Sequence, residues 1–223
     1  MSEPSNRGAA STRTQILHAA AELFAERPYG LVSLEDIIAK TEISKGSLYF
    51  HFRTKYALAV AVIDERSSSV LASANELLAR KLSALESLID LEYFIAVQDV
   101  VDVRTRAAMN LVESIGRMAD LQSRVLGEWS SGLAGILAQA MAEGDIVYDG
   151  EPRDLSRFLV SLYMGTRRIS SFTQPEQFLA GIERSWRLVL HTFADPERVD
   201  FFTEFVKRRT ALASGQISSA RDH

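Results

Sequence analysis

Small polar and basic side chains follow one another in the segment 44–55, where their chemistry would suit contact with a nucleic acid. Lys45 can reach either a guanine edge or a phosphate, and the Ser47 hydroxyl can donate to or accept from a base edge. Gly46 carries no side chain, so the backbone could approach a duplex closely there. The segment therefore combines residues that could read bases with a position that admits close approach.

The neighbouring residues favour contact with phosphates, which position a protein on DNA without reading its sequence. Tyr49 and His51 suit such contacts, and the predicted helix start at Thr54 and Lys55 adds amide donors and a cation. Residues 40–55 hold four Lys or Arg side chains and a single acidic one, although the whole chain has a formal net charge of -4. A larger acidic domain can mask a small DNA-reading module in this way.

These residues lie on a predicted helix-turn-helix, in which the second helix enters the major groove. Ser33 can cap the first helix, with Asp36 completing a variant of the capping box. Ser44 can cap the second helix, over residues 45–50, after a break at 41–43. The candidate DNA contacts are Ser33, Ser44, Lys45, Gly46, Ser47, Tyr49, His51, Thr54 and Lys55. The predicted packing side of the second helix is Leu48, Phe50 and Phe52.

The rest of the chain repeats the three- and four-residue periodicity of amphipathic helices, without the sustained alternation that is typical of strands. The fourth helix, which begins near Thr54, continues past residue 70 and is expected to connect two domains. Further helices are predicted near 83–98, 102–114, 119–143, 154–172, 176–193 and 195–213. The predicted fold class is therefore all-α.

The predicted organisation has four parts. A polar arm over residues 1–11 is expected to be disordered, because it lacks periodicity. A three-helix DNA-binding domain follows over 12–55. A larger helical domain over 56–213 carries far more apolar helix than DNA reading requires, and a flexible polar tail covers 214–223.

Composition narrows the possible functions. A hydrophobic fraction of 47% with 24% charged residues is ordinary for a globular, cytoplasmic protein, and no apolar stretch approaches the roughly 20 residues of a membrane span. The polar start lacks the apolar core of a signal peptide. The absence of cysteine excludes disulfides and thiolate metal sites. Phosphate loops, nucleophile elbows and paired metal-spaced histidines are also absent, so no cofactor, metal or catalytic activity is predicted.

The stretch 43–52, ISKGSLYFHF, with Lys55 and the preceding 34–39, LEDIIA, resembles the signature of TetR-type transcriptional repressors. The resemblance covers about residues 12–60. It implies a homodimer whose N-terminal domains bind double-stranded DNA, and whose larger domains dimerise and hold a small-molecule pocket.

Two positions depart from the family pattern. Glu42 stands where the family usually has a glycine, just before the position of Ile43. Pro28 stands where a glycine often precedes the aromatic residue that Tyr29 matches. Neither residue lies in the predicted recognition helix, so the resemblance still implies DNA binding.

The last predicted helices are expected to hold the two-fold interface. They are rich in apolar and aromatic residues, and two of them could form a four-helix bundle with their mates across the dimer axis. Gly165 would allow close helix approach there. The alternative is that these side chains form the core of one subunit.

A finer likeness is to the γ-butyrolactone receptors of actinomycetes. It rests on the motif around Tyr49, on Leu58-Ala59, on Glu128-Trp129 and on Gly165-Thr166-Arg167. In that subgroup a tryptophan on a long central helix lines the ligand pocket, and Trp129 matches it; the alternative is that Trp129 is a core residue. The likeness implies a small apolar, butyrolactone-like effector, and its predicted contacts are Trp129, Gly132, Met109, Leu133 and Tyr163.

The sequence therefore predicts a ligand-responsive repressor that binds a palindromic operator as a dimer and is released by a small-molecule effector. The two recognition helices would lie about 34–36 Å apart, or a multiple of that. Two alternatives stay open. A DNA-binding dimer without an effector would be favoured by a pocket too small or too polar for a ligand. A helical enzyme or scaffold would be favoured by the absence of salt-dependent DNA binding.

Overall fold

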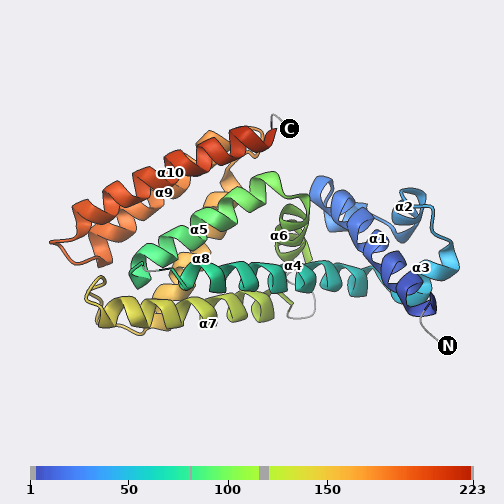
Figure 1. The fold of residues 1–223 in the computed structure, drawn as a ribbon, viewed down its shortest axis with the longest axis horizontal. Helices are drawn as coiled ribbons and strands as arrows, with labels where there is room; N and C mark the ends of the chain where they lie inside the picture. Colours follow the sequence, from blue (N-terminus) through green and yellow to red (C-terminus); the bar gives the residue numbers. More distant parts are fainter. Residues whose placement is uncertain (1–3, 81, 116–120, 222–223) are drawn as a thin grey trace. The chain divides into compact units, whose positions relative to one another are not determined.

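The computed structural model describes residues 4–80, 82–115 and 121–221 (Figure 1). Over these residues the elements are helices, with a 3-10 turn at Tyr29–Leu31 and one isolated antiparallel bridge between Ile146 and Ala194. The helices are α1 (Pro4–Glu26), α2 (Leu34–Ala39), α3 (Lys45–His51), α4 (Lys55–Leu78), α5 (Ala84–Val101), α6 (Val103–Ile115), α7 (Leu121–Ala142), α8 (Pro152–Ile169), α9 (Pro175–Phe193) and α10 (Val199–Arg221). The predicted all-α fold class is confirmed, and no helix in these ranges is both long and apolar enough to cross a membrane.

The chain divides into two compact units. The first, here called the head, comprises residues 1–71 and 102–122, so it holds α1 to α3, most of α4, and α6. The second, here called the body, comprises residues 72–101 and 123–223, with α5 and α7 to α10. The sequence placed everything after residue 55 in one large domain. The structure instead groups α6 with the DNA-binding helices, because α6 packs on α1.

The core of the head forms around α1, whose predicted apolar face is buried. Ile16, Ala20 and Phe24 of this face are fully buried. On α6 the facing side is rich in small and branched residues, and Ala107 and Val112 are also fully buried. α1 also contacts α2 and α3, so one helix supports both halves of the helix-turn-helix.

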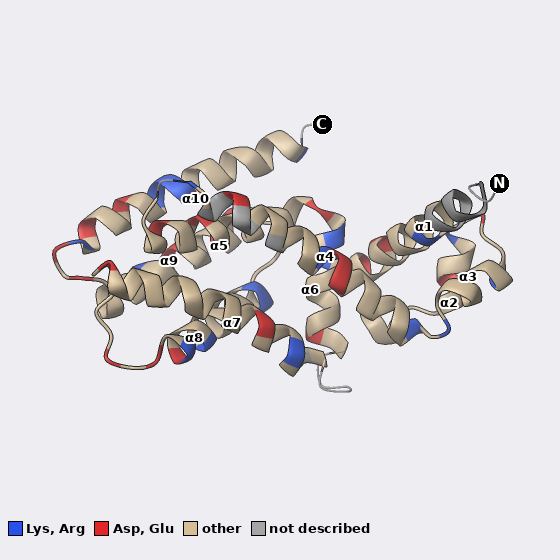
Figure 2. Ribbon diagram, turned by 60° about the horizontal axis from the view of Figure 1, so that its bottom comes forward, with Lys and Arg blue, Asp and Glu red and all other residues tan. Residues whose placement is uncertain are grey.

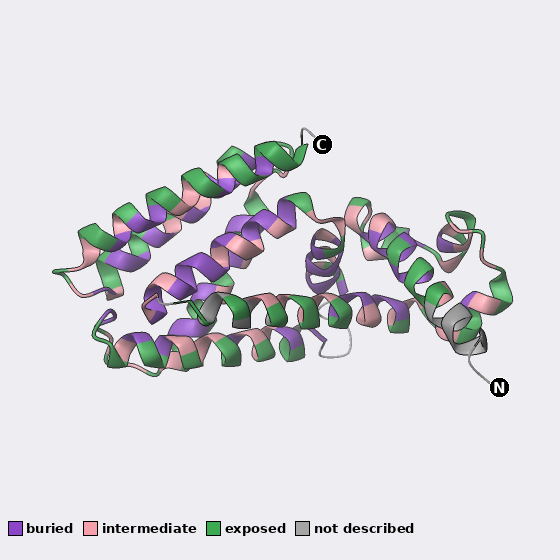
Figure 3. Cartoon of the chain, viewed as in Figure 1, coloured by how far each residue is buried: buried purple, intermediate pink, exposed green. Residues whose placement is uncertain are grey.

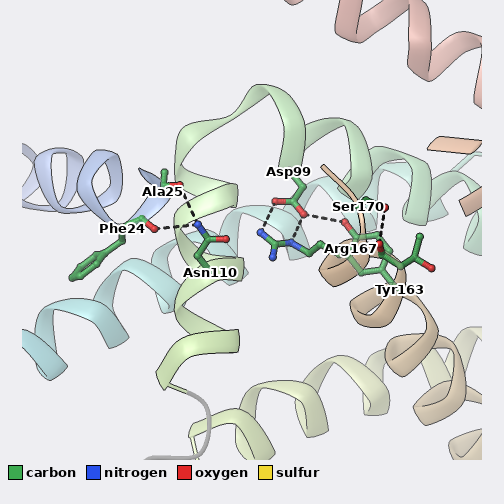
Figure 4. Close-up of polar contacts among 8 residues, drawn as sticks. Phe24, Ala25, Asp99, Asn110, Tyr163, Arg167 and Ser170 are labelled. Atoms are coloured by element: carbon green, nitrogen blue, oxygen red, sulfur yellow. Dashed lines mark hydrogen bonds and ion pairs between the residues drawn. The ribbon is translucent and has the colours of Figure 1, made fainter. Parts of the chain in front are cut away.

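A polar contact closes the junction of α1 with α6. The Asn110 side-chain amide of α6 donates hydrogen bonds to the carbonyls of Phe24 and Ala25, at 3.2 and 3.1 Å (Figure 4). These carbonyls belong to the last turn of α1, where a helix leaves its carbonyl groups without intrahelical partners. Asn110 therefore caps α1 from another helix and fixes the position of α6 within the head.

The body is built around α5, which is buried along most of its length (Figure 3). α10 packs on both α5 and α9, and α8 packs on α9. Phe178, Trp186 and Phe202 are the largest fully buried side chains of α9 and α10. α7 ends where Gly144 adopts a left-handed φ of 78°. The next amide, of Asp145, then donates to the carbonyl of Ala140 at 2.9 Å, which closes the helix end.

Two segments predicted to be irregular are helical instead. α1 begins at Pro4, within the predicted arm, because an existing helix extends without a new nucleation step and proline is tolerated in its first turn. α10 continues through the predicted tail to Arg221. Ala213 and Ile217, one turn apart, are buried there, and the Arg221 guanidinium donates to the Phe172 carbonyl at 2.9 Å. A single isoleucine among polar residues gave no periodic signal in the sequence.

The Asn110 cap yields a test of the head's construction. We expect Asn110→Ala to lower the free energy of unfolding by about 1–3 kcal/mol, because two part-buried carbonyls lose their donor. Urea denaturation followed by circular dichroism measures this change. The matched control is Ser114→Ala on the same helix, whose exposed hydroxyl only bonds the Asn110 carbonyl one turn away. An equally small effect of both substitutions would contradict the proposed capping role.

Candidate DNA-binding surface and ligand region

The predicted helix caps of the DNA-binding segment are present. The Asp36 amide donates to the Ser33 hydroxyl at 3.0 Å, and the Ser33 amide donates to the Asp36 carboxylate at 2.8 Å, which forms a complete capping box. Hydrogen bonds from the Ser33 backbone and side chain hold the pKa of Asp36 below its usual value. Ser44 caps α3 by accepting from the Ser47 amide at 3.2 Å, and Thr54 accepts from the Ala57 amide at 3.0 Å before α4.

The turn between α2 and α3 forms without the glycine that the family pattern has at Glu42. The Thr41 hydroxyl donates to the carbonyls of Ile37 and Ile38, at 3.2 and 3.1 Å. It thereby satisfies the end of α2, and the Glu42 side chain remains exposed. A side-chain cap thus completes the turn in this chain.

α3 has one buried edge and one exposed edge. Leu48 is fully buried and Phe52 is 5% exposed, and these two residues anchor the helix in the head. Lys45 and Gly46 are exposed on α3, and Tyr49 is 37% exposed. The predicted DNA contacts on α3 therefore lie where a partner could reach them.

The prediction that Phe50 packs against the head is wrong, since its side chain is 79% exposed. Leu48 and Phe52 are four residues apart and share a face, whereas Phe50 lies between them and points away from it. Its ring packs edge-on against the His51 ring, at a centroid distance of 5.1 Å. The sequence analysis placed Leu48, Phe50 and Phe52 on one packing side. Residues two apart do not share a face of a helix, so Phe50 cannot pack with the other two.

Lys55 has a different role from the predicted phosphate contact. Its ammonium donates to the carbonyls of Tyr29 and Val32, at 2.8 and 2.7 Å. It also lies 4.2 Å from the centroid of the Tyr29 ring. Lys55 therefore holds the 3-10 turn between α1 and α2, and the same contacts order the turn that Pro28 begins.

Gly46 has no evident internal reason to be glycine. A Cβ built at this position would meet no heavy atom closer than the Ser44 hydroxyl, at 4.0 Å. Glycine inside a helix costs about 1 kcal/mol relative to alanine. The missing side chain therefore leaves the backbone of α3 accessible from outside the protein at its exposed edge.

The predicted effector contacts are distributed over both units. Met109 is buried on α6 in the head. Trp129 is partly buried and Gly132 is exposed, both on α7 in the body. Leu133 belongs to an apolar cluster around Leu91.

Tyr163 takes part in a buried polar cluster that joins α8 to α5 (Figure 4). The Arg167 guanidinium forms a two-pronged ion pair with the Asp99 carboxylate, with Nε–Oδ2 at 2.6 Å and Nη2–Oδ1 at 3.2 Å. The Tyr163 hydroxyl donates to the same carboxylate at 3.5 Å. Burial, and then the charge of Asp99, raises the pKa of Tyr163 above its usual value. Arg167 belongs to the Gly-Thr-Arg triplet of the sequence, and here it is a structural residue.

The body contains an apolar cavity that sequence reasoning did not locate. It measures about 10 Å³, roughly the space of one water molecule, and its lining comes from α5, α7, α8, α9 and the segments that follow α7 and α9. Leu85 and Leu88 of α5, Leu155 and Leu159 of α8, and Trp186 and Leu190 of α9 are among the residues that line it. Helices so far apart in the chain leave no joint signal in a single sequence.

Trp186 and Glu92 are two polar groups of the body without a conventional hydrogen-bond arrangement. The buried Nε1–H of Trp186 lies beside the Glu92 carboxyl and donates to it, although the geometry of this hydrogen bond is irregular. Glu92 of α5 is partly buried, and desolvation raises the pKa of its carboxyl to about 8. The Trp186 indole is near enough to lower this pKa, but it offsets only part of the desolvation.

Charged residues occur on the helices of both units (Figure 2). Within the described ranges, His, Asp and Glu form no cluster of three or more that could hold a metal ion.

Comparison with known proteins identifies the family. Residues 16–62 match the description "Bacterial regulatory proteins, tetR family", and this range contains α2, α3 and both caps of the helix-turn-helix. The N-terminal part of this chain is therefore a DNA-binding domain of the TetR family. The family assignment confirms the resemblance that the sequence motif suggested.

The resemblance to full-length TetR relatives extends over both units. The chain is 27% identical over 189 residues to the A-factor receptor protein of Streptomyces griseus, covering 84% of this chain and 66% of that protein, just under two thirds of its length. A γ-butyrolactone receptor structure, described as ArpA-like, superposes with a TM-score of 0.77 and 27% identity over 91% of this chain and 98% of the other. CprB of Streptomyces coelicolor, solved with its operator, superposes with a TM-score of 0.75 and 26% identity. This match also covers 91% of this chain and 98% of the other.

These relatives confirm the predicted likeness to butyrolactone receptors within the TetR family. The matched family is described as bacterial regulatory proteins, and CprB was solved with its operator. These descriptions agree with the prediction of ligand-responsive DNA-binding repression, which stays a prediction for this chain.

The raised pKa of Glu92 gives a test that needs no ligand. Between the usual pKa of 4.5 and about 8, the folded state keeps a proton that the unfolded state has released, so stability falls as the pH rises through this window. We therefore expect Glu92→Gln to unfold at a higher temperature than the parent at pH 8, by on the order of 2–4 °C, with little difference at pH 4.5.

Thermal unfolding of both proteins between pH 4.5 and 9 provides the measurement. Glu128→Gln on α7 is the control, because it removes the charge of an exposed carboxylate on another helix. A profile of Glu92→Gln that runs parallel to the parent's would show that Glu92 titrates normally.

Proposed function

We propose that this chain is a transcriptional repressor that binds a palindromic operator as a homodimer and releases it when a small apolar molecule binds the body. The observation that supports DNA binding best is the exposed edge of α3, where Lys45, Gly46 and Tyr49 are accessible while Leu48 is buried. A helix held on one side and exposed on the other can enter the major groove. The fold similarity to CprB, solved with its operator, supports the same use of the head.

The proposed contacts divide by chemistry. Lys45 and Ser47 are assigned to base edges, with Lys45 also able to reach a phosphate. Ser33, Ser44, Tyr49, His51 and Thr54 are assigned to phosphates, which set the register of the head on DNA. Lys55 acts indirectly, because its ammonium is bonded to two carbonyls of the head and positions the turn before α2.

Gly46→Ala separates binding to DNA from folding. The chain has room for the added methyl group, so the variant should fold at least as stably as the parent. On DNA the methyl group would occupy the surface that faces the duplex, and we expect operator affinity to fall at least tenfold. A mobility-shift assay with the DNA flanking this protein's own gene measures the change, alongside a thermal unfolding curve.

Tyr49→Ala is the companion variant, with an expected loss of shift through a lost phosphate contact. Glu42→Ala, in the exposed turn, serves as the control that should still bind. Unchanged affinity in both Gly46→Ala and Tyr49→Ala would remove α3 from the DNA interface. The parent's affinity should also fall as salt rises, since phosphate contacts release counterions.

The proposed dimer interface uses the exposed faces of α8 and α9. Phe158 is 47% exposed, Ile169 87% and Leu188 72%, although all three are large apolar side chains. Phe158, Gly165 and Ile169 share one face of α8, where the exposed Gly165 would let a partner helix come close. Apolar patches of this kind mark interaction sites, and a two-fold pairing of α8 and α9 would form a four-helix bundle.

Substitution of this face should separate the subunits. We expect Ile169→Glu combined with Leu188→Glu to convert a dimer into a monomer by size-exclusion chromatography with light scattering. Operator affinity should also fall, because a monomer has one head whereas the dimer has two. Val147→Glu, at a 61% exposed apolar residue outside both helices, is the matched control. A double variant that stays dimeric would place the interface elsewhere.

The effector is proposed to bind the body, with Trp129, Gly132, Leu133 and Tyr163 as the initial candidates and Met109, in the head, as a more distant one. α4 is one continuous helix that begins in the head and ends in the body, so its tilt could couple the two. Coupling of the usual size would weaken operator binding by roughly 1–3 kcal/mol. The A-factor and γ-butyrolactone receptors among its relatives support a small apolar signal.

A repressor without an effector is the second candidate, because the apolar cavity in the body measures only about 10 Å³. Such a protein would bind its operator and respond to no small molecule. In either case we propose that the chain acts by binding and without catalysis, metal or cofactor. Its partner is chromosomal DNA, which places its action in the bacterial cytoplasm.

A further inference from the structure

We infer that the head contains a second ligand site, a cleft between α1, α4 and α6 that binds a small oxyanion, either inorganic phosphate or a short carboxylate, through Arg66 and Arg104. This inference goes beyond the proposed function, because the cleft is built from head residues that belong to neither the proposed DNA contacts nor the proposed effector contacts. The site would give the protein a ligand input in the head itself.

The cleft combines buried apolar residues with polar residues nearer the surface. Leu17 and Ala21 of α1 and Val62 of α4 are its buried apolar part. The rest of its lining is polar and comprises Thr14, His18, Glu65, Arg66, Ser69 and Arg104. Its volume is about 60 Å³, which is room for roughly four to six water-sized groups. Inorganic phosphate and short carboxylates are of this size.

Arg66 of α4 is held in position at the cleft. Its side chain is 14% exposed, its Nη1 donates to the Ser69 hydroxyl at 3.1 Å, and its Nε lies 3.6 Å from the Asp102 carboxylate. That carboxylate is shared, because it also accepts from the amide and the hydroxyl of Thr105 at the start of α6, at 3.2 and 2.7 Å. The Arg66 guanidinium is therefore oriented before a ligand arrives, which lowers the entropy cost of binding.

Arg104 of α6 brings a second guanidinium to the same cleft. Its side chain is 48% exposed, and its ion pair with Glu65 of α4 measures 3.8 Å, which is longer than a hydrogen bond. The two guanidiniums affect each other: burial lowers the pKa of Arg66, Asp102 opposes this change, and the charge of Arg104 lowers the pKa further. Like charges at this cleft repel each other, and an anion bound between them would relieve the repulsion.

The chemistry of the lining selects an oxyanion. A guanidinium presents paired N–H donors that match two oxygens of a phosphate or a carboxylate. Of the described residues that line the cleft, two are arginines and Glu65 alone is acidic, so the lining carries an excess of positive charge. The hydroxyls of Thr14 and Ser69 lie at the same cleft and can donate further hydrogen bonds to ligand oxygens.

A bound oxyanion would join α4 to α6 within the head. The ion pairs of Arg66 with Asp102 and of Arg104 with Glu65 already link α4 to the start of α6, and the ligand would add a bridge between the two arginines. α4 begins with Lys55, which holds the turn before α2. The ligand therefore stabilises the head at a helix that also supports the helix-turn-helix.

Calorimetry of the full-length protein with phosphate and with acetate, at constant ionic strength set by chloride, tests this site. We expect saturable binding to the parent, and Arg104→Gln to weaken it about fivefold or more, as for the loss of a charge-assisted hydrogen bond. Glu65→Gln should bind the oxyanion about twofold to fivefold more tightly, because the carboxylate that competes for Arg104 is gone.

The matched controls are Arg124→Gln and Glu128→Gln on α7, which remove the members of another ion pair of similar exposure. Both should bind the oxyanion as the parent does. Thermal unfolding gives a second readout that tolerates weak binding. At ten times its Kd, the oxyanion should raise the unfolding temperature of the parent by roughly 2–4 °C, and that of Arg104→Gln by less.

The outcomes separate the cleft from other places where an anion could bind. Tighter binding of phosphate than of acetate, or the reverse, would support the site and identify the oxyanion as a phosphate or a carboxylate. Equal affinity in the parent and Arg104→Gln, or weaker binding in Glu65→Gln, would overturn it. Loss of binding in Lys45→Gln with retention in Arg104→Gln would place the anion on the DNA-binding surface instead. A protein that shifts its operator but binds neither anion would overturn this inference alone.

Discussion

The unpaired carbonyls at the end of α1 set the construction of the head. A helix cannot satisfy its last carbonyl groups by itself, and here Asn110 of α6 supplies donors to Phe24 and Ala25. Just after α1 in the sequence, the carbonyls of Tyr29 and Val32 accept hydrogen bonds from Lys55 of α4. Asn110 thus holds the end of α1, and Lys55 holds the chain between α1 and α2, so α6 and α4 both support the helix-turn-helix.

α3, the proposed reading helix, depends on that support because it is too short to be stable alone. α3 has two turns, and an isolated helix of this length is marginal in water. Leu48 and Phe52 fix it to the head, and the Ser44 cap satisfies its first amides. The opposite edge is then free to carry Lys45, Gly46, Tyr49 and the exposed Phe50. Stability and recognition thus use different faces of the same two turns.

The body combines an apolar interior with a few buried polar groups of unequal status. Asp99 and Arg167 satisfy each other and join α5 to α8. Trp186 and Glu92 lie beside each other, and the hydrogen bond from the indole offsets only part of the desolvation of the Glu92 carboxyl. The ion pair joins two helices, whereas the raised pKa of Glu92 makes the stability of the body depend on pH.

The sequence by itself determined the all-α class, the caps at Ser33, Ser44 and Thr54, and the exposed edge of α3, because these features arise from residues three or four apart. It misplaced Phe50, the role of Lys55 and the ends of α1 and α10. The tertiary structure alone decided that α6 belongs to the head, that Ile217 is buried, and that Trp186 lines a cavity. Those features depend on contacts between helices far apart in the chain, and the periodicity of one helix shows which face is apolar but not which partner covers it.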